Sequence, residues 1–348
     1  MRICYLLEST ELCGGVRVVF DQARALQKLG HRVTIRALRG DHLWYPYPVD
    51  VDYVSDLSAE FVRHEERQDI VIATFWTTVK PALRLSGRKR FHLCQGYEGD
   101  NREYADRKDL IEDSYKVPVP KLTVGDWLSK RLIDLFGSGG FAVHTIGQIV
   151  DLDLYRPLPF WKRWFSTERS GGTRVLVSGL FDASVKAIGD ALQAVALLRE
   201  SGIEVNLTRV STSDTLTREN EITAVDEYLI SVPPARMAAI YQASDLFIAP
   251  SLSHEGFGLP FGEALACGIP SVATAIPSHM SFDIDHDYAC FVPEGDPPSI
   301  ADAALNIMKD RDLRTRLRKR GIEVVRNKFR SDMVAARLES VFSEALKS

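Results

Sequence analysis

Residues 246–273 read LFIAPSLSHEGFGLPFGEALACGIPSVA, and they carry the clearest secondary-structure pattern in the chain. An apolar run, Leu246–Ala249, leads into a glycine-rich loop, and an apolar helical pattern then continues to Gly268. A second apolar run, Ser271–Ala273, follows at once. Continuous apolar strands separated by helices are typical of a parallel sheet that is covered on both faces. Pro260 suits the first turn of the helix and Gly268 suits its carboxyl end. The stretch therefore predicts a strand–loop–helix–strand unit of an α/β protein.

The same alternation runs through the whole chain. Further strands are expected at Ile3–Leu7, Val33–Leu38, Ile70–Thr74, Phe91–Cys94, Leu122–Val124, Thr173–Ser178, Val205–Val210 and Cys290–Val292. Two such sets predict two doubly wound parallel-sheet domains, which we place at residues 1–157 and 158–330 because residues 155–172 have the composition of a linker. We expect the last helix, within residues 331–348, to pack back toward the first domain.

Composition excludes several classes of protein. The 348 residues carry 43 Lys and Arg against 47 Asp and Glu, and 45% of them are hydrophobic, which predicts a globular protein without the basic excess of a nucleic-acid binder. The first apolar run is interrupted at Glu8, and no run reaches the roughly 20 residues of a membrane span. The cysteines are scattered without a C-x-x-C pattern, so we expect thiols in the core and a cytoplasmic protein: Cys4, Cys13, Cys94, Cys267 and Cys290.

The glycine-rich loop has the features of an anion site. Gly256 and Gly258 let the backbone approach a ligand closely, and the amides of Phe257 and Leu259 lie next to a helix N-terminus that favours negative charge. The alternative is a plain strand–helix turn.

Two carboxylates bracket this loop. Glu255 precedes it and could accept hydrogen bonds from sugar hydroxyls. Glu263 is expected in the first helical turn, where the helix dipole would keep it ionised and able to accept two ribose hydroxyls. An anion cradle between two hydroxyl acceptors suits a nucleotide sugar, whereas a capping role for the second carboxylate is the plainer alternative.

The pattern from Glu255 to Glu263, Glu-x7-Glu with Gly-Phe-Gly-Leu-Pro inside it, closely resembles the donor-site signature of GT-B glycosyltransferases of family GT4. Residues 237–251 resemble the lead-in helix and strand of that family, and residues 14–16 with 29–34 resemble its first strand–loop–helix–strand. Residues 146–157 resemble its interdomain segment. The resemblance implies a GT-B fold, in which two Rossmann-like domains face each other across a cleft that holds the active site.

The resemblance also implies an activity. It implies retaining, metal-independent transfer of a hexosyl or deoxyhexosyl group from a nucleoside-diphosphate sugar to a hydroxyl of a glycan, a lipid-linked sugar or a small molecule, without a further cofactor. Attack would come from the front face, with the leaving diphosphate assisting deprotonation. Catalysis would then rest on positioning and leaving-group stabilisation.

One loop departs from the family pattern. GT4 enzymes usually carry an Arg just after the glycine at position 179 and a Lys a few residues later, both on the donor diphosphate. Here Leu180 occupies the position of the Arg, so Lys186 is the expected diphosphate cation. Lys186 and Glu255 are therefore the expected catalytic residues.

Gly14 and Gly15 follow the first strand, and the resemblance places them near the diphosphate. No later glycine completes a dinucleotide fingerprint there, which disfavours a dehydrogenase. Gln95 stands where GT4 enzymes often have a cleft histidine, and with Trp76 and Tyr97 it is expected on the acceptor side.

Three D-x-D patterns imitate metal ligands, but none closes a strand beside the nucleotide loop, so no metal is expected. They are Asp151-x-Asp153, Asp283-x-Asp285 and Asp285-x-Asp287. Basic residues 84 and 88–90, and the aromatic and basic run 161–165, would suit peripheral contact with a membrane.

Two other functions stay open. A GT-B-fold nucleotide-sugar epimerase would act without an acceptor. A non-catalytic partner subunit that binds nucleotide sugars or carbohydrate is favoured by the missing Arg and His. The residues favour no particular nucleobase, sugar, acceptor or oligomeric state.

Overall fold

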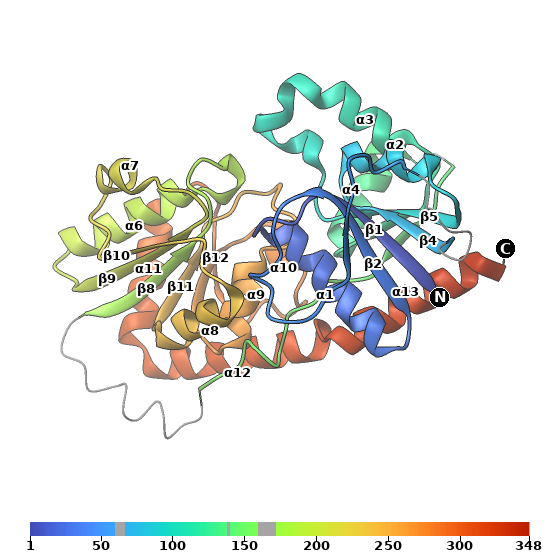
Figure 1. Ribbon diagram of the computed structural model, residues 1–348. Coiled ribbons are helices and arrows are strands. Elements are labelled where there is room, and N and C mark those ends of the chain that lie inside the picture. Colours follow the sequence, from blue (N-terminus) through green and yellow to red (C-terminus); the bar gives the residue numbers. More distant parts are fainter. Residues whose placement is uncertain (60–66, 138–139, 159–171, 348) are drawn as a thin grey trace. The chain divides into compact units, whose positions relative to one another are not determined.

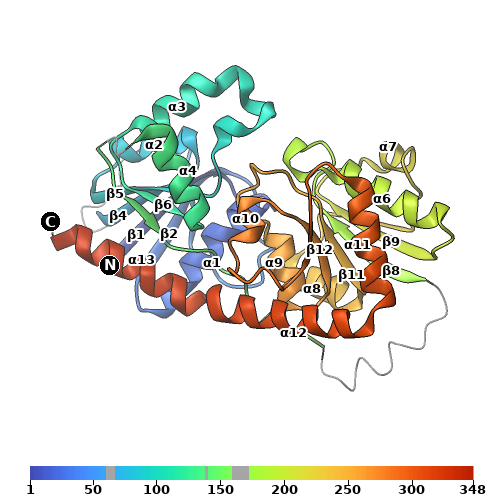
Figure 2. The same ribbon diagram turned by 180° about the vertical axis from the view of Figure 1, so that it is seen from behind.

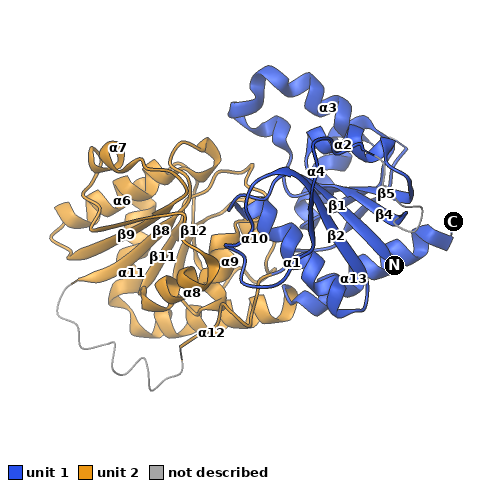
Figure 3. Cartoon of the chain, in the orientation of Figure 1, with its two compact units in different colours: residues 1–149, 329–348 blue, residues 150–328 orange. Residues whose placement is uncertain are grey.

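The computed structural model describes residues 1–59, 67–137, 140–158 and 172–347. The chain divides into two compact units, residues 1–149 with 329–348 and residues 150–328 (Figure 3). The first unit ends at Ile149 rather than at residue 157, because the segment that follows packs on the second unit. There the ring of Tyr155 lies 5.9 Å from that of Tyr241, and its hydroxyl donates to the Pro234 carbonyl at 3.5 Å.

The first unit contains a seven-stranded sheet in the order β3-β2-β1-β4-β5-β6-β7, in which neighbouring strands are parallel (Figure 1). Its strands are β1 (Arg2–Ser9), β2 (Arg32–Arg39), β3 (Val51–Tyr53), β4 (Gln68–Ala73), β5 (Gly87–Cys94), β6 (Lys121–Thr123) and β7 (Val143–Thr145). Its helices are α1 (Gly14–Lys28), α2 (Trp76–Arg84), α3 (Lys108–Lys116), α4 (Asp126–Phe136) and α13 (Ser331–Lys347), with the 3₁₀ helices η2 (Glu98–Asp100) and η3 (Arg102–Arg107).

The last helix, α13, belongs to the first unit. It packs against α1 and β5 and buries Val334, Ala335, Leu338 and Phe342. The ring of Phe342 lies 5.1 Å from that of Phe91 on β5. The apolar face of the helix therefore completes the core of the sheet with which the chain begins.

The second unit contains a six-stranded parallel sheet in the order β10-β9-β8-β11-β12-β13. Its strands are β8 (Thr173–Ser178), β9 (Val205–Ser211), β10 (Glu227–Ile230), β11 (Leu246–Ala249), β12 (Ser271–Thr274) and β13 (Cys290–Val292). Its helices are η4 (Ser184–Lys186), α6 (Ile188–Glu200), α7 (Leu216–Asn220), α8 (Pro234–Ala243), α9 (Leu259–Ala266), α10 (Pro277–Met280), α11 (Pro297–Lys309) and α12 (Arg311–Lys328). Helices α6 and α11 pack side by side (Figure 2).

Both sheets are doubly wound. In the first unit the chain moves from β1 to β2 in one direction and from β4 to β5 in the other, and in the second it does the same from β8 to β9 and from β11 to β12. Right-handed crossovers then place the connecting helices on opposite faces and open a crevice at the carboxyl ends of the two central strands. Ligand-binding loops are therefore expected after β1 and β4, and after β8 and β11.

Three short strands were not predicted, namely β3, β7 and β10. Each lies at an edge of its sheet, and none has a fully buried residue. Edge strands need an apolar pattern on at most one face, so they lack the continuous apolar run that identifies a central strand.

Helix α12 fixes the position of α9. A side chain at Gly321 of α12 would begin 2.9 Å from the Leu265 side chain of α9. Arg318 of α12 donates from Nε to the Gly268 carbonyl at 2.8 Å, just beyond the end of α9. The close approach of the two helices therefore depends on a glycine. In the described residues, no helix combines the length and apolarity needed to cross a membrane.

Candidate functional site

Lys186 and Glu255 meet at the carboxyl ends of the two central strands of the second unit. Lys186 ends η4 in the loop after β8, and Glu255 lies in the loop after β11. The Lys186 Nζ lies 2.6 Å from Glu255 Oε2, and the two side chains are 27% and 10% exposed. The structure therefore brings the two expected catalytic residues together at the switch point of the sheet, where a ligand crevice forms.

The Glu255 carboxylate is held in its ionised form. The Ser251 hydroxyl also donates to its Oε2 at 3.1 Å. Burial raises the pKa of Glu255, but the Lys186 ammonium, helped by His279 and the Ser251 hydroxyl, outweighs burial and holds that pKa below its ordinary value. The carboxylate is therefore an acceptor that a sugar hydroxyl can use.

His279, which sequence reasoning missed, is fully buried and acts electrostatically on Glu255. Its Nδ1 lies 3.2 Å from the Thr274 carbonyl oxygen, and because a carbonyl only accepts, that nitrogen carries the proton. Burial lowers the pKa of His279 to about 4, against the opposing effect of Glu255. Its only signal in the sequence is its place shortly after a predicted strand.

Acid is expected to weaken the second unit through His279. In the unfolded chain His279 takes up a proton near its ordinary pKa of 6.5, but in the folded chain only near a pKa of 4. The free energy of unfolding therefore falls as the pH falls from 6.5 toward 4. The linkage amounts to about 3 kcal/mol over that window. In urea unfolding at pH 7.5 and 4.5, the stability of the wild type relative to His279→Gln is expected to fall at the lower pH. Equal differences at both pH values would contradict the buried, neutral histidine.

The glycine loop has the conformation that its composition predicts. Gly258 precedes α9 with φ of +78°, Pro260 lies in the first turn, and Gly268 follows the helix with φ of +72°, which confirms the expected roles of Pro260 and Gly268. A Cβ at Gly258 would lie 2.7 Å from His279 Nε2, so both the backbone and the neighbour require glycine there. The ring of Phe257 stacks on Phe282 at 4.7 Å.

The loop thus presents the start of α9 to the crevice. The first amides of a helix have no acceptor inside it, and they attract anions together with the helix dipole. Of the expected donor residues, Gly256, Phe257, Gly258 and Leu259 form this segment, directly after Glu255.

The expected position of Glu263 in the first helical turn is wrong. Helix α9 begins at Leu259, immediately after the left-handed Gly258, so Glu263 is its fifth residue and no acidic residue lies in the first turn. The helix dipole acts mainly within the first turn and therefore contributes less to Glu263 than expected. The carboxyl group is buried within the second unit, at 2% exposure.

The remaining expected site residues lie in the first unit, at the ends of its central strands. Gly14 and Gly15 begin α1, and Gln95 Nε2, after β5, donates to the Gly15 carbonyl at 3.1 Å. Trp76 begins α2 after β4. Tyr97 is 5% exposed and packs edge-on against the ring of Tyr115 at 5.0 Å, so most of its surface is used in the core. The ligand contacts of these residues stay predictions.

Glu98 is a second residue that sequence reasoning did not single out. Its Oε2 accepts from the Tyr115 hydroxyl at 2.5 Å, in the segment just after β5. Burial raises the pKa of Glu98 to about 7, against the Tyr115 hydrogen bond, which lowers it. A carboxyl group that titrates near neutral pH therefore stands beside the predicted acceptor-side residues.

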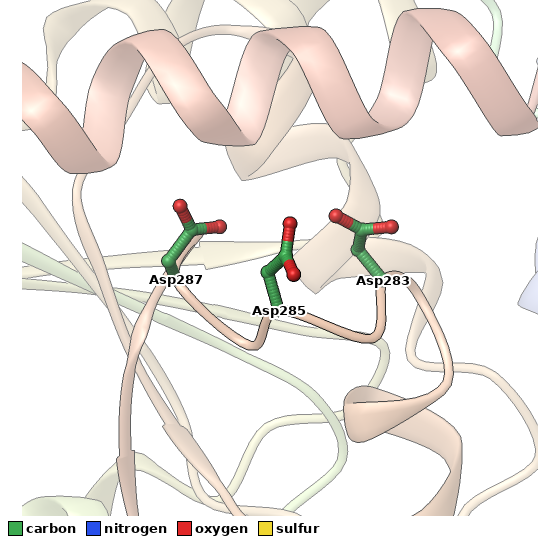
Figure 4. A group of neighbouring side chains, drawn as sticks. All are labelled: Asp283, Asp285 and Asp287. Carbon is green, nitrogen blue, oxygen red and sulfur yellow. The ribbon is translucent and has the colours of Figure 1, made fainter.

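Asp283, Asp285 and Asp287 place carboxylate oxygens within 4.8 Å of one another (Figure 4). Arg320 donates to Asp287 at 2.9 Å and to Asp283 at 2.8 Å, and Lys328 Nζ lies 3.0 Å from Asp283. These cations neutralise the carboxylates and tie the loop before β13 to α12. A metal ion would have to displace them, so the cluster is better explained as a structural ion-pair network.

Some basic residues of the first unit form bonds to groups within that unit. Arg90 donates to the carbonyls of Ala82 at 2.9 Å and of Leu85. Arg88 is exposed and lies 3.7 Å from Asp69. The other stretch expected to suit a membrane, residues 161–165, lies outside the described residues, so membrane contact stays a prediction.

Comparison with known proteins agrees with this geometry. Residues 172–310, which include both Lys186 and Glu255, match the family model described as glycosyl transferases group 1. The chain is 28% identical over 281 residues to the phosphatidyl-myo-inositol mannosyltransferase of Mycobacterium leprae, covering 80% of this chain and 68% of that protein. It is 30% identical over 233 residues to the D-inositol 3-phosphate glycosyltransferase of Xylanimonas cellulosilytica, covering 63% of this chain but only 55% of that protein.

The fold extends beyond these alignments. The crystal structure of Anabaena HepE in complex with UDP-glucose matches with a TM-score of 0.76 at 14% identity, over 99% of this chain and 100% of that one. The resemblance first noted at the Glu-x7-Glu pattern is thereby confirmed. Residues 172–310 are thus similar to the group 1 family of glycosyltransferases, and the two parallel-sheet units have the Rossmann-like architecture of the GT-B fold.

Proposed function

We propose that this chain transfers a glycosyl group from a nucleoside-diphosphate sugar to a hydroxyl acceptor, with retention of configuration and without a metal ion. The Lys186–Glu255 pair at the switch point carries the proposal, because it places a cation and a hydroxyl acceptor beside the start of α9. An ammonium group has three donors, so Lys186 can keep Glu255 while it binds a diphosphate oxygen.

In the proposed reaction the bond between the sugar C1 and the diphosphate oxygen breaks, and its electron pair leaves with the diphosphate. The acceptor oxygen bonds to C1 on the same face and gives its proton to a diphosphate oxygen. Lys186 and the amides at the start of α9 stabilise the charge that develops on the leaving group. Glu255 holds the donor sugar through its hydroxyls, and Glu263 holds the ribose.

The acceptor proposed is a polyol or a lipid-linked polyol. Two relatives are named for transfer to phosphatidyl-myo-inositol and to inositol 3-phosphate. The donor proposed for the first tests is a UDP-sugar, because HepE was crystallised with UDP-glucose.

Product analysis separates this function from its two alternatives. The chain is incubated with UDP-, GDP-, ADP-, dTDP- and CDP-sugars, with and without inositol, inositol phosphates and phosphatidylinositol vesicles, in the presence of EDTA. We expect a glycoside with the donor's anomeric configuration, formed only when an acceptor is present. Isomerised donor without an acceptor would indicate an epimerase, and donor binding without turnover would indicate a partner subunit.

Substitutions of the two carboxylates are expected to have different effects on nucleotide binding and on transfer. Glu263→Ala removes the ribose acceptor and should weaken binding of donor and free nucleoside diphosphate alike, by about tenfold or more. Glu255→Gln keeps the shape of the side chain and should lower transfer much more than nucleoside-diphosphate binding. Calorimetric Kd values and turnover rates for both variants decide this. Full activity in both variants would show that the assignment is wrong.

A further inference from the structure

Arg209 is a fully buried arginine on the strand next to β8 in the second sheet. It lies on β9, and its side chain and that of Glu219 on α7 are both 0% exposed. Arg209 Nε lies 2.6 Å from Glu219 Oε2, and Arg209 Nη2 lies 2.9 Å from Glu219 Oε1, so the two side chains form a bidentate ion pair. Burying two charges costs several kcal/mol, so stability alone is a weak reason for this pair.

The other donors of Arg209 reach the end of β8 and the neighbouring end of β9. Its Nη1 donates to the carbonyls of Val177 at 2.9 Å and Val210 at 3.2 Å, and its Nη2 donates to the Gly179 carbonyl at 3.0 Å. The five donors of the guanidinium are thus all engaged. Arg209 therefore holds the carboxyl end of β8 and the first residue of the loop that follows it.

Glu219 is held in turn by hydroxyl groups. The Thr215 hydroxyl donates to its Oε1 at 2.7 Å, and the Tyr228 hydroxyl, which lies 3.0 Å from the Ser213 carbonyl oxygen, is 3.4 Å from the same Oε1. The Tyr228 hydroxyl also accepts from the Thr215 amide at 3.0 Å. These contacts fix the Glu219 carboxylate, and the carboxylate in turn orients the Arg209 guanidinium.

The loop that Arg209 holds is the one that carries Lys186. The stem of Lys186 packs against Gly179, since a Cβ at that glycine would lie 3.5 Å from Lys186 Cγ. One residue before Lys186, the Val185 carbonyl accepts from the Leu252 amide at 2.8 Å, which ties the loop to the segment that carries Glu255.

From these contacts we propose that Arg209 and Glu219 are positioning residues, which hold the Gly179 carbonyl so that Lys186 reaches the donor diphosphate. The proposal rests on the function proposed above. Neither side chain touches the donor; both act through the loop.

The test is a double-mutant cycle with Lys186. Arg209→Met with Glu219→Leu replaces the buried pair by apolar side chains of similar size, an exchange that folded proteins often tolerate. The Kd is measured for UDP, GDP, ADP, dTDP and CDP. For whichever of these the wild type binds, we expect the Kd to rise about tenfold in this variant. When Lys186 is already alanine, the same exchange should change the Kd by less than about twofold, because the pair acts only through Lys186.

A second, partly exposed ion pair gives the control, with side chains 24% and 43% exposed. Arg199 pairs with Asp226 at 2.6 Å and donates to the Val205 carbonyl at 2.9 Å, at the opposite end of β9. Arg199→Met with Asp226→Leu should lower the melting temperature and leave the Kd unchanged.

If the variant with Arg209→Met and Glu219→Leu folds poorly, amide hydrogen exchange in a milder variant tests the same proposal. Thr215→Val, which removes only one support of Glu219, should speed exchange in residues 180–187 and leave β11 protected. Equal Kd changes with and without Lys186, or unchanged exchange in residues 180–187, would overturn the positioning role. If the wild type binds none of the five nucleotides, the proposed function itself fails, which is a different result.

Discussion

Replacing Lys186 by methionine is expected to lower the turnover rate on the order of 10²–10³-fold. Methionine keeps the stem that packs on Gly179 and removes the ammonium that lies 2.6 Å from Glu255. The leaving diphosphate then lacks its expected side-chain cation. Initial rates at saturating donor and acceptor measure this effect.

A double variant separates the chemical loss from a loss of folding. In Lys186→Met the carboxylate of Glu255 is left buried without its cation, so the melting temperature should fall as well. Adding Glu255→Gln removes that buried charge and should restore the melting temperature, while activity stays low. Lys319→Met, on an exposed position of α12, is the matched control and should change neither. An active Lys186→Met enzyme would mean that Lys186 does not act on the leaving group.

Gly258→Ala is expected to disrupt the loop at the start of α9. The residue has φ of +78°, and its new Cβ would lie 2.7 Å from His279 Nε2. The left-handed backbone costs about 1 kcal/mol for alanine, and the contact with a buried ring adds to that cost. We expect a lower melting temperature and a Kd for nucleoside diphosphate that is at least about tenfold higher.

Gly202→Ala provides a close comparison. Gly202 has φ of +76°, and nothing lies within 4 Å of the Cβ that it would gain. Its replacement therefore measures the cost of the backbone alone. Gly258→Ala should lose clearly more stability than Gly202→Ala, and a further His279→Ala should recover part of the difference. Equal losses at the two glycines would contradict the contact with His279.

The central strands and the donor loop could be predicted because their signals are local. The run 246–249, the glycines at 256 and 258, and the cap at Gly268 lie within about one strand–helix unit, and the structure has each where it was expected. The start of α9 was misjudged relative to Glu263, because the left-handed conformation of Gly258 sets the first helical residue and is not visible in composition.

The parts of the site that were missed depend on contacts between distant residues. His279 reaches the Glu255 loop only through the turn after β12, and Arg209 reaches Gly179 only because β9 pairs with β8. A single buried arginine in a strand looks like an interruption of the apolar pattern until its partners are known. The edge strands were missed for a related reason. An edge strand has a neighbouring strand on one side only, and its apolar pattern is therefore weak.

Calorimetric titration of the chain with UDP, GDP, ADP, dTDP and CDP is the direct test of the donor site. The donor site described around Lys186, Glu255 and the start of α9 predicts that at least one of them binds at one site per chain. It also predicts that the same nucleotide binds markedly more weakly to Lys186→Met and Glu263→Ala. Failure of all five to bind at millimolar concentration, or unchanged affinity in both variants, would contradict this donor site.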